Sequence, residues 1–128
     1  MKRIVISIQN FMLAEAIAMA LKKQGQFNPE RIHPEKSEDI VSVCRTIQAD
    51  ILLMEVTHLY QSNMESRLKI CSTMKEQMPE CKLALICDDS ADSALADEVK
   101  QTKQLGRIDT FFFMSVTARY LVAALDAL

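Results

Sequence analysis

The sequence predicts one α/β domain: a doubly wound, five-stranded parallel sheet flanked by five helices. Short apolar runs alternate with amphipathic segments along the 128 residues, which is the pattern of repeated β-α units. The run 51–56 is apolar except for Glu55, as expected of a strand covered by helices on both faces of its sheet. Only two glycines and three prolines occur, which disfavours an all-β sandwich with many tight turns.

Composition limits the domain count and the class of partner. A chain of 128 residues suffices for one domain with a real core, so we expect a single domain over 1–128. The net charge is −2, and no basic surface argues for direct nucleic acid binding. The apolar run after Met1-Lys2-Arg3 is too short for a signal sequence or a membrane span. We therefore expect a cytoplasmic protein that does not associate with membranes.

The strands follow from the apolar runs. We expect them at 3–8, 31–33, 51–56, 82–87 and 110–113. The second is the weakest, and Pro34 ends it. Right-handed crossovers between parallel strands place the intervening helices on both faces of the sheet.

Helix boundaries are predicted by capping residues and helix breakers. Asn10 can cap a helix over 11–24, which Gly25 stops. Ser37 is expected to cap a second helix, and Pro79 follows a third helix over 64–77. The apolar stripe of that third helix is expected at Leu68, Cys71, Met74 and Met78. A fourth helix is expected from about Ser90 to before Gly106 and a fifth over 117–128.

The four cysteines do not predict a metal site. They contain no C-x-x-C pair, and only His33 and His58 are available to join them as ligands. Small buried side chains in a reducing cytosol are the better interpretation. The cysteines are Cys44, Cys71, Cys81 and Cys87.

The turn after the first strand excludes several chemistries. It reads Ile8-Gln9-Asn10-Phe11, without the glycines that a dinucleotide or P-loop site needs. It also lacks the cysteine of a phosphatase loop, and no serine nucleophile elbow is present. We therefore expect no cofactor and no enzymatic activity. The carboxyl ends of the strands would form one mouth from Gln9, Asn10, Glu55, Val56, Cys87, Asp88 and Met114.

Two segments carry a family resemblance. The run Asp50-Ile51-Leu52-Leu53-Met54-Glu55-Val56 resembles the strand that ends on the phospho-accepting aspartate of response regulator receiver domains. The stretch 111–117 (Phe-Phe-Phe-Met-Ser-Val-Thr) resembles their fifth strand and its lysine-containing turn. The likeness covers nearly the whole chain, and it implies the flavodoxin-like receiver fold of two-component signal transduction.

The chain departs from the receiver pattern at the residues that carry its chemistry. Glu55 stands at the phosphoacceptor position, and Met114 at that of the phosphate-binding lysine. The acidic residues that would hold Mg²⁺ correspond to Ile8 and Gln9, or to Gln9 and Asn10 after a shift of one residue. The resemblance thus implies a degenerate pocket without a metal. Its members besides Glu55 are Ile8, Gln9, Asn10, Cys87, Asp88 and Met114.

Several of these residues allow two interpretations. Glu55 is either a solvated acid at a strand end or a permanent charge that imitates a phosphoaspartate. Asp88 and Asp89 either replace the missing metal ligands or lead into the fourth helix, where they favour its dipole. Cys87 matches best the position of the receiver hydroxyl that signals phosphorylation, and Phe111 matches the switch aromatic.

The resemblance implies an atypical receiver that acts through dimerisation or partner binding without phosphorylation. Its surfaces would be the fourth helix, fifth strand and fifth helix, or the first and fifth helices. The start of the first helix, 11–17, is similar to receivers attached to a LuxR-type helix-turn-helix, so a DNA-binding output domain and transcriptional regulation are expected beyond this chain. Two alternatives remain: a receiver phosphorylated on Glu55 or through a rearranged acidic pocket, and a flavodoxin-like small-ligand binder or enzyme. The candidate contact residues are Phe111, Arg119, Tyr120 and Leu121.

Overall fold

The computed structural model describes residues 1–32 and 37–128 and contains one five-stranded parallel sheet. The strand order is β2-β1-β3-β4-β5, so the winding reverses between β1 and β3, as in doubly wound folds. This confirms the predicted fold class. The strands are β1 Lys2–Ser7, β2 Phe27–Arg31, β3 Ile51–Glu55, β4 Lys82–Cys87 and β5 Thr110–Phe113.

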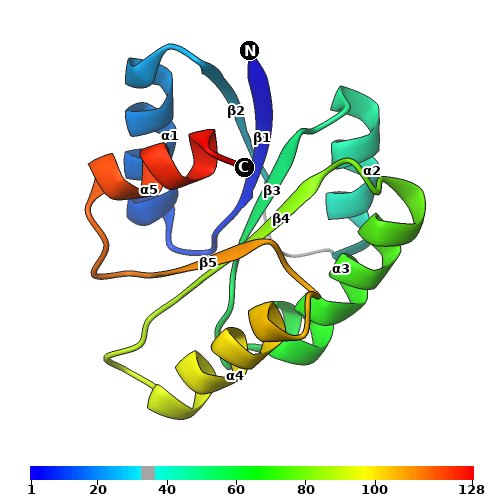
Figure 1. Ribbon diagram of the computed structural model, residues 1–128, viewed down its shortest axis with the longest axis vertical. Coiled ribbons are helices and arrows are strands. Elements are labelled where there is room, and N and C mark those ends of the chain that lie inside the picture. The colour runs from blue at the N-terminus through cyan, green and yellow to red at the C-terminus, as the bar shows by residue number, and fades with distance from the viewer. Residues whose placement is uncertain (33–36) are drawn as a thin grey trace.

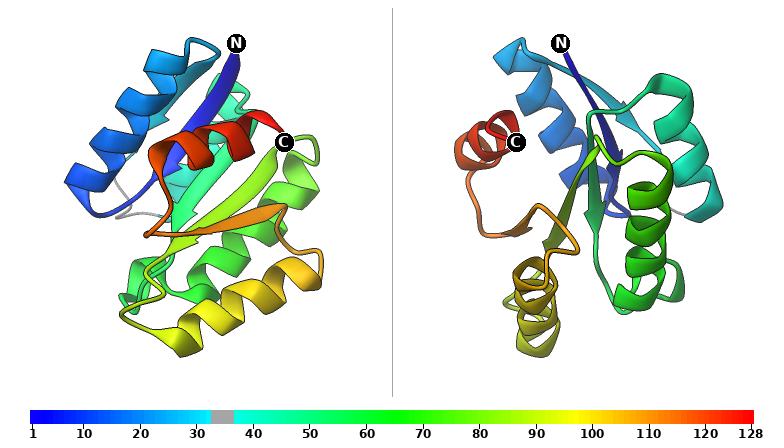
Figure 2. Two further views of the ribbon diagram at one scale, coloured as in Figure 1. Left: turned by 60° about the vertical axis from the view of Figure 1, so that its left-hand side comes forward. Right: turned by 45° about the vertical axis from the view of Figure 1, so that its right-hand side comes forward.

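The helices cover both faces of the sheet (Figures 1 and 2). One face carries α1 and α5, which lie side by side, and the other carries α2 and α3, with α4 packed near the β5 edge. A short 3₁₀ helix, η1 Tyr60–Ser62, precedes α3. The helices are α1 Phe11–Gln24, α2 Ser37–Ile47, α3 Met64–Gln77, α4 Ser93–Gln104 and α5 Ala118–Asp126.

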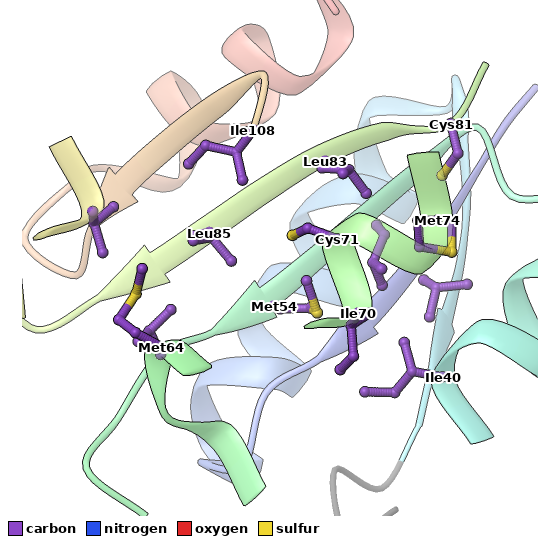
Figure 3. Packing of buried hydrophobic residues seen from close by; sticks show 14 of the residues in the cluster. Ile40, Met54, Met64, Ile70, Cys71, Met74, Cys81, Leu83, Leu85 and Ile108 are labelled. Atoms are coloured by element: carbon purple, nitrogen blue, oxygen red, sulfur yellow. The ribbon is translucent and has the colours of Figure 1, made fainter. Parts of the chain in front are cut away.

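Alternate residues of the buried strands enter two separate cores. In β3, Leu52 and Met54 pack with α2, α3 and α4, while Ile51 and Leu53 pack with α1 and α5. This alternation is the period of two of a β-strand. Figure 3 shows the first core, where side chains from α3 lie against those of β3 and β4. Burial on both faces explains why β3 reads as an uninterrupted apolar run.

Local capping fixes several helix ends where the sequence predicts them. The Asn10 side chain accepts a hydrogen bond from the Leu13 N–H at 3.1 Å and caps α1. Gly25 follows α1 with φ +88°, a left-handed conformation that favours glycine. The bounds of α1 and α3 match the prediction, whereas α2 begins at Ser37 itself, one residue earlier than a helix capped by Ser37 would begin.

The second strand and the fourth helix differ from the prediction. β2 lies at Phe27–Arg31 rather than 31–33, and its pairing with β1 begins at Phe27 opposite Lys2. Pro29 is tolerated there because β2 is an edge strand. The expected ends of the second strand, His33 and Pro34, lie outside the described residues. Helix α4 begins at Ser93 instead of near Ser90, because Asp92 caps it through the Leu95 N–H at 3.1 Å.

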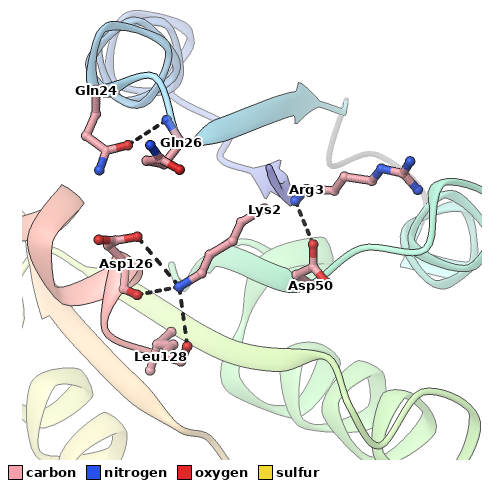
Figure 4. A network of polar contacts seen from close by, with 7 residues as sticks. All are labelled: Lys2, Arg3, Gln24, Gln26, Asp50, Asp126 and Leu128. Carbon is pink, nitrogen blue, oxygen red and sulfur yellow. Dashed lines mark hydrogen bonds and ion pairs between the residues drawn. The ribbon is translucent and has the colours of Figure 1, made fainter.

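The amino ends of the central strands are tied to the last helix (Figure 4). The Asp50 carboxylate accepts a hydrogen bond from the Arg3 main-chain N–H at 2.8 Å. The Lys2 ammonium lies 3.6 Å from the Asp126 carboxylate and also donates to the Asp126 carbonyl. The first strand and the end of α5 therefore lie together, at the edge opposite the mouth formed by the strand carboxyl ends.

Candidate functional site

Glu55 ends β3 at the carboxyl edge of the sheet, and its side chain is buried. The residue is only 5% exposed, and its Oε1 accepts a hydrogen bond from the Gln9 main-chain N–H at 2.8 Å. This bond joins the end of β3 to the turn between β1 and α1. The interpretation of Glu55 as a solvated acid at a strand end is therefore wrong. The carboxylate is held as an internal acceptor of the pocket.

A buried arginine contacts the main chain of Glu55, and the sequence did not predict it. Arg67 comes from the first turns of α3 and has no exposed surface. Its Nε donates to the Glu55 carbonyl at 2.8 Å, and its Nη2 donates to the Ser7 carbonyl at 3.3 Å. The guanidinium thus spans the carboxyl ends of β3 and β1, the two strands at which the winding of the sheet reverses.

The charge state of Arg67 follows from two opposing effects. Burial lowers the pKa of the guanidinium to about 10, and the nearby negative charge of Glu55 partly offsets that decrease. This value lies well above neutral pH, so Arg67 stays charged. Among the described residues, neither its Nη1 nor the buried hydroxyl of Ser7 has a hydrogen-bond partner. The pocket therefore contains a buried cation whose hydrogen bonds within the protein are incomplete.

The turn after β1 supplies no second carboxylate. Ile8 is buried in the core that faces α1 and α5, and Gln9 contributes its main-chain N–H to Glu55. The amide oxygen of Asn10 is used to cap α1. The structure thus brings Gln9 and Glu55 into direct contact and directs Ile8 and Asn10 to structural roles.

The end of β4 does not replace the missing acids. The Asp88 carboxylate accepts hydrogen bonds from the Ser90 hydroxyl at 2.7 Å and from the main-chain N–H groups of Ser90 and Ala91. These bonds, the hydroxyl bond first, lower the pKa of Asp88. Asp88 closes a turn that precedes α4, and the helix begins at Ser93 rather than near Ser90, where the prediction placed its start. Cys87 is fully buried, and this burial raises the pKa of its thiol to about 11.

The loop after β3 is joined to the start of α4 by one polar contact. The His58 imidazole contacts the carboxylate of Asp92, the residue that caps α4. The hydrogen bond from Leu95, together with this contact, lowers the pKa of Asp92. Two loops that border the mouth are therefore linked without a bound ligand.

A methionine stands at the turn after β5, at the position where the sequence resemblance predicts the receiver lysine. Met114 is half-buried, packs against the core of α1 and α5, and lines an apolar cavity of about 180 Å³ with Leu13 and Ile86. Among residues 1–32 and 37–128, no three His, Cys, Asp or Glu side chains are grouped to hold a metal. Mg²⁺ requires several hard oxygen ligands. One engaged carboxylate beside a buried guanidinium does not fit such an ion.

The candidate contact residues separate into surface and core. Arg119 and Tyr120 are exposed, whereas Leu121 is 2% exposed and belongs to the core of α1 and α5, so its expected surface role is wrong. Phe111 is half-buried, with its ring 5.4 Å from that of Phe113. The Lys103 ammonium lies 6.0 Å from the Phe111 ring centre, within the range of a cation–π contact.

Similar proteins are found through structure alone. No protein-family model matches the sequence, and no curated protein matches it. The chain is similar to a LuxR-family DNA-binding response regulator from Staphylococcus aureus, with 10% identity and a TM-score of 0.77 over 99% of this chain and 98% of that one. The chain has the receiver fold. The response regulator TrrA from Thermotoga maritima, solved with Mg²⁺ and a beryllofluoride, gives 15% identity and a TM-score of 0.74 over 99% and 98% of the two chains.

Another similar structure represents a different use of the receiver fold. It is described as a family of streptococcal redox sensors that evolved from two-component response regulators, with 16% identity and a TM-score of 0.78. The match covers 99% of this chain and 50% of that one. Within the part of the present chain that the structure describes, no helix is long and apolar enough to cross a membrane.

Proposed function

We propose that this chain is an atypical receiver domain that regulates an output without accepting phosphate. The observation that carries the proposal is the state of Glu55: its carboxylate is 5% exposed, accepts the Gln9 N–H, and lies near the buried charge of Arg67. A phosphoacceptor must reach the donor and share a metal with it. The buried, engaged carboxylate meets neither need, and Met114 offers no cation to a phosphoryl group.

We propose that the domain acts in two-component signal transduction in the cytoplasm. The similar structures include response regulators from several bacteria, one of them a DNA-binding regulator of the LuxR family. An output domain of this type beyond the present chain would make the whole protein a transcriptional regulator. The described residues would then contribute the regulatory surface and leave contact with DNA to the output domain.

The exposed surface of α1 and α5 supports a homodimer as the working state. Met12 and Met19 are 80% and 64% exposed, and with Ala16 they form one stripe along α1, since they lie four and then three residues apart. Exposed methionines are common at adaptable protein-binding surfaces. Helices α1 and α5 lie side by side (Figure 2), and Ala16 of this stripe lines a cavity together with Ala118 and Leu121 of α5.

Charge supports a second copy of this chain as the occupant of that surface. A groove of about 520 Å³ between α1 and α5 is lined by Lys23 and Arg119 and by the acid Asp126. A two-fold axis through the groove would place the cations of one copy opposite the acid of the other. An isologous interface requires this kind of self-complementarity.

The decisive test of phosphate independence is an amide NMR titration of the full chain with Mg²⁺, followed by beryllofluoride. We expect a silent spectrum, since the pocket offers one engaged carboxylate. Shifts grouped at Glu55, Cys87 and Phe111 would show a working phosphorylation switch and would favour the phosphorylatable receiver. Shifts from a flavin or nucleotide added in a parallel sample would favour the small-ligand binder instead.

The dimer is tested by light scattering after size-exclusion chromatography. Met19→Glu places a charge in the centre of the α1 stripe, and we expect it to shift a wild-type dimer to monomer. Leu105→Glu is the matched control, because Leu105 is 76% exposed at the end of α4. A wild-type chain that is monomeric at 100-fold different concentrations would exclude the homodimer and direct the search to a different protein partner.

A further inference from the structure

Arg67 is the most unusual buried group of the molecule. It has no exposed surface and occupies the inner stripe of α3 together with Met64, Cys71 and Met74. Removing a guanidinium from water is strongly unfavourable unless an opposite charge and hydrogen bonds compensate it. A position between apolar core residues would ordinarily hold another apolar side chain, so the arginine requires a specific compensation.

Its hydrogen bonds provide only part of this compensation. Nε and Nη2 donate to neutral main-chain carbonyls, those of Glu55 and Ser7, and Nη1 has no partner among the described residues. Carbonyl dipoles orient the guanidinium but do not cancel its net charge. The carboxylate that acts on it is that of Glu55, whose negative charge raises the pKa of Arg67 against the effect of burial. The two groups are therefore coupled through charge.

We infer that Arg67 is the built-in counter-cation of the pocket, and that its guanidinium supplies the positive charge which a receiver of the usual kind obtains from a metal ion and a lysine. This inference deepens the proposed phosphate-independent function and rests on it. The Glu55 carboxylate is held by the Gln9 main-chain N–H, and the Arg67 guanidinium is held by the Glu55 and Ser7 carbonyls, so both charged groups are fixed at the ends of β1 and β3. A divalent cation would add two charges beside a buried cation, so the pocket disfavours the metal that phosphotransfer needs.

Arg67 also fixes the position of Glu55 at the end of β3. Its Nε is bonded to the carbonyl of Glu55, while the Glu55 carboxylate is bonded to the turn between β1 and α1. The end of β3 is thus fixed from both sides. Arg67 acts through Glu55 and the strand ends and is therefore a positioning residue.

The coupling is tested by combining Glu55→Gln with two changes at Arg67. Arg67→Lys keeps the positive charge, and Arg67→Gln removes it while it keeps a polar donor. We expect Glu55→Gln to lower the urea midpoint in wild type and in Arg67→Lys, since it leaves a buried cation uncompensated. In Arg67→Gln the same change should leave the midpoint unchanged or raise it, since it removes a carboxylate that has lost its counter-ion. Arg45→Gln is the control for a lost arginine, because Arg45 is exposed on α2.

An equal effect of Glu55→Gln in all three backgrounds would overturn the inference and leave Arg67 as a clamp on two carbonyls. If neither variant at position 67 folds, the side-chain Nε–H resonance of Arg67 in Glu55→Gln alone decides. A shifted resonance with faster hydrogen exchange supports charge compensation, because the main-chain acceptor of Nε is not altered. An unchanged resonance contradicts it.

Failure of this inference can be distinguished from failure of the proposed function. The beryllofluoride titration of the wild-type chain tests whether the pocket takes phosphate and is independent of the double-variant comparison. The titration could be silent while Glu55→Gln has the same effect in all three backgrounds. That result would support the phosphate-independent function and reject Arg67 as the counter-cation. Chemical-shift changes on adding Mg²⁺ and beryllofluoride would reject the proposed function. They would also show that a metal ion can bind beside the Arg67 guanidinium, which contradicts the argument that the pocket disfavours metal.

Discussion

The four buried thiols should make the stability of this protein fall steeply at alkaline pH. The ordinary thiol pKa of 9.0 is raised by burial to about 12 for Cys44 and Cys81 and to about 11 for Cys71 and Cys87. Between pH 9 and these values the unfolded chain loses thiol protons that the folded chain retains. The folded state then binds more protons, so the free energy of unfolding decreases as pH rises, and the stabilisation is complete only below about pH 9.

The magnitude follows from the same pKa differences. From pH 8 to pH 10, each thiol that ionises only in the unfolded chain lowers the free energy of unfolding by about 1 kcal/mol, and all four together lower it by roughly 4–5 kcal/mol. This is a large share of the roughly 5–15 kcal/mol that stabilises an ordinary domain. Urea denaturation at pH 8, 9 and 10, followed by circular dichroism, measures the effect.

The control separates the thiols from other groups that titrate at high pH. Cys87→Ala removes one of the four thiols and should reduce the pH slope by about a quarter, whatever it does to stability at pH 8. A slope that is the same in this variant, or native thiols that react with a disulfide reagent as fast as free cysteine, would refute the argument from burial. Since the thiolate is the form that is oxidised, inert thiols would also argue against thiol oxidation as a signal in this chain.

Three further predictions concern the elements that frame the site. Asn10→Ala removes the cap of α1 and should destabilise the fold by about 1 kcal/mol, measured by urea denaturation; a change near zero would mean that water replaces the bond to Leu13. Phe112→Ala removes a core ring that is 3% exposed and lies 6.5 Å from the ring of Tyr120. It should lower the free energy of unfolding by about 3–5 kcal/mol, measured by a thermal melt. A loss under about 1 kcal/mol would contradict a tightly packed core. In Gly25→Ala the added Cβ would meet no atom within 4 Å, so only the left-handed backbone conformation opposes the change. We expect the free energy of unfolding to fall by about 1–2 kcal/mol in the same melt. An unchanged melting temperature would show that the turn relaxes.

Local signals in the sequence were sufficient where the structure depends on local contacts. Asn10 and Gly25 define the ends of α1 through contacts within a few residues, and both could be read directly. The buried strand β3 was evident because both of its faces are covered. The edge strand β2 was misplaced, because Asn28 and Glu30 in its centre are polar and exposed and flank Pro29. Only its pairing with β1 makes this segment a strand.

The position of the pocket acid was predictable, but its environment was not. The end of β3 identified Glu55 as the acid at the carboxyl edge, since strand order and apolar pattern determine that placement. Its burial depends on the Gln9 N–H, which comes from another strand end 46 residues away in sequence. A solvated acid and a buried acceptor have the same local sequence, so the choice between them required the fold.

Arg67 shows most clearly why the site could not be completed from the sequence. The helical spacing predicted an inner stripe of α3 through Leu68, because an apolar residue fits a core better than a cation. The structure instead buries Arg67 and leaves Leu68 half-exposed. The acceptors that make this possible are carbonyls 12 and 60 residues away, at the ends of β3 and β1. A buried arginine becomes predictable only once its acceptors and counter-charge are placed, and in this chain they meet only where the parallel strands end together.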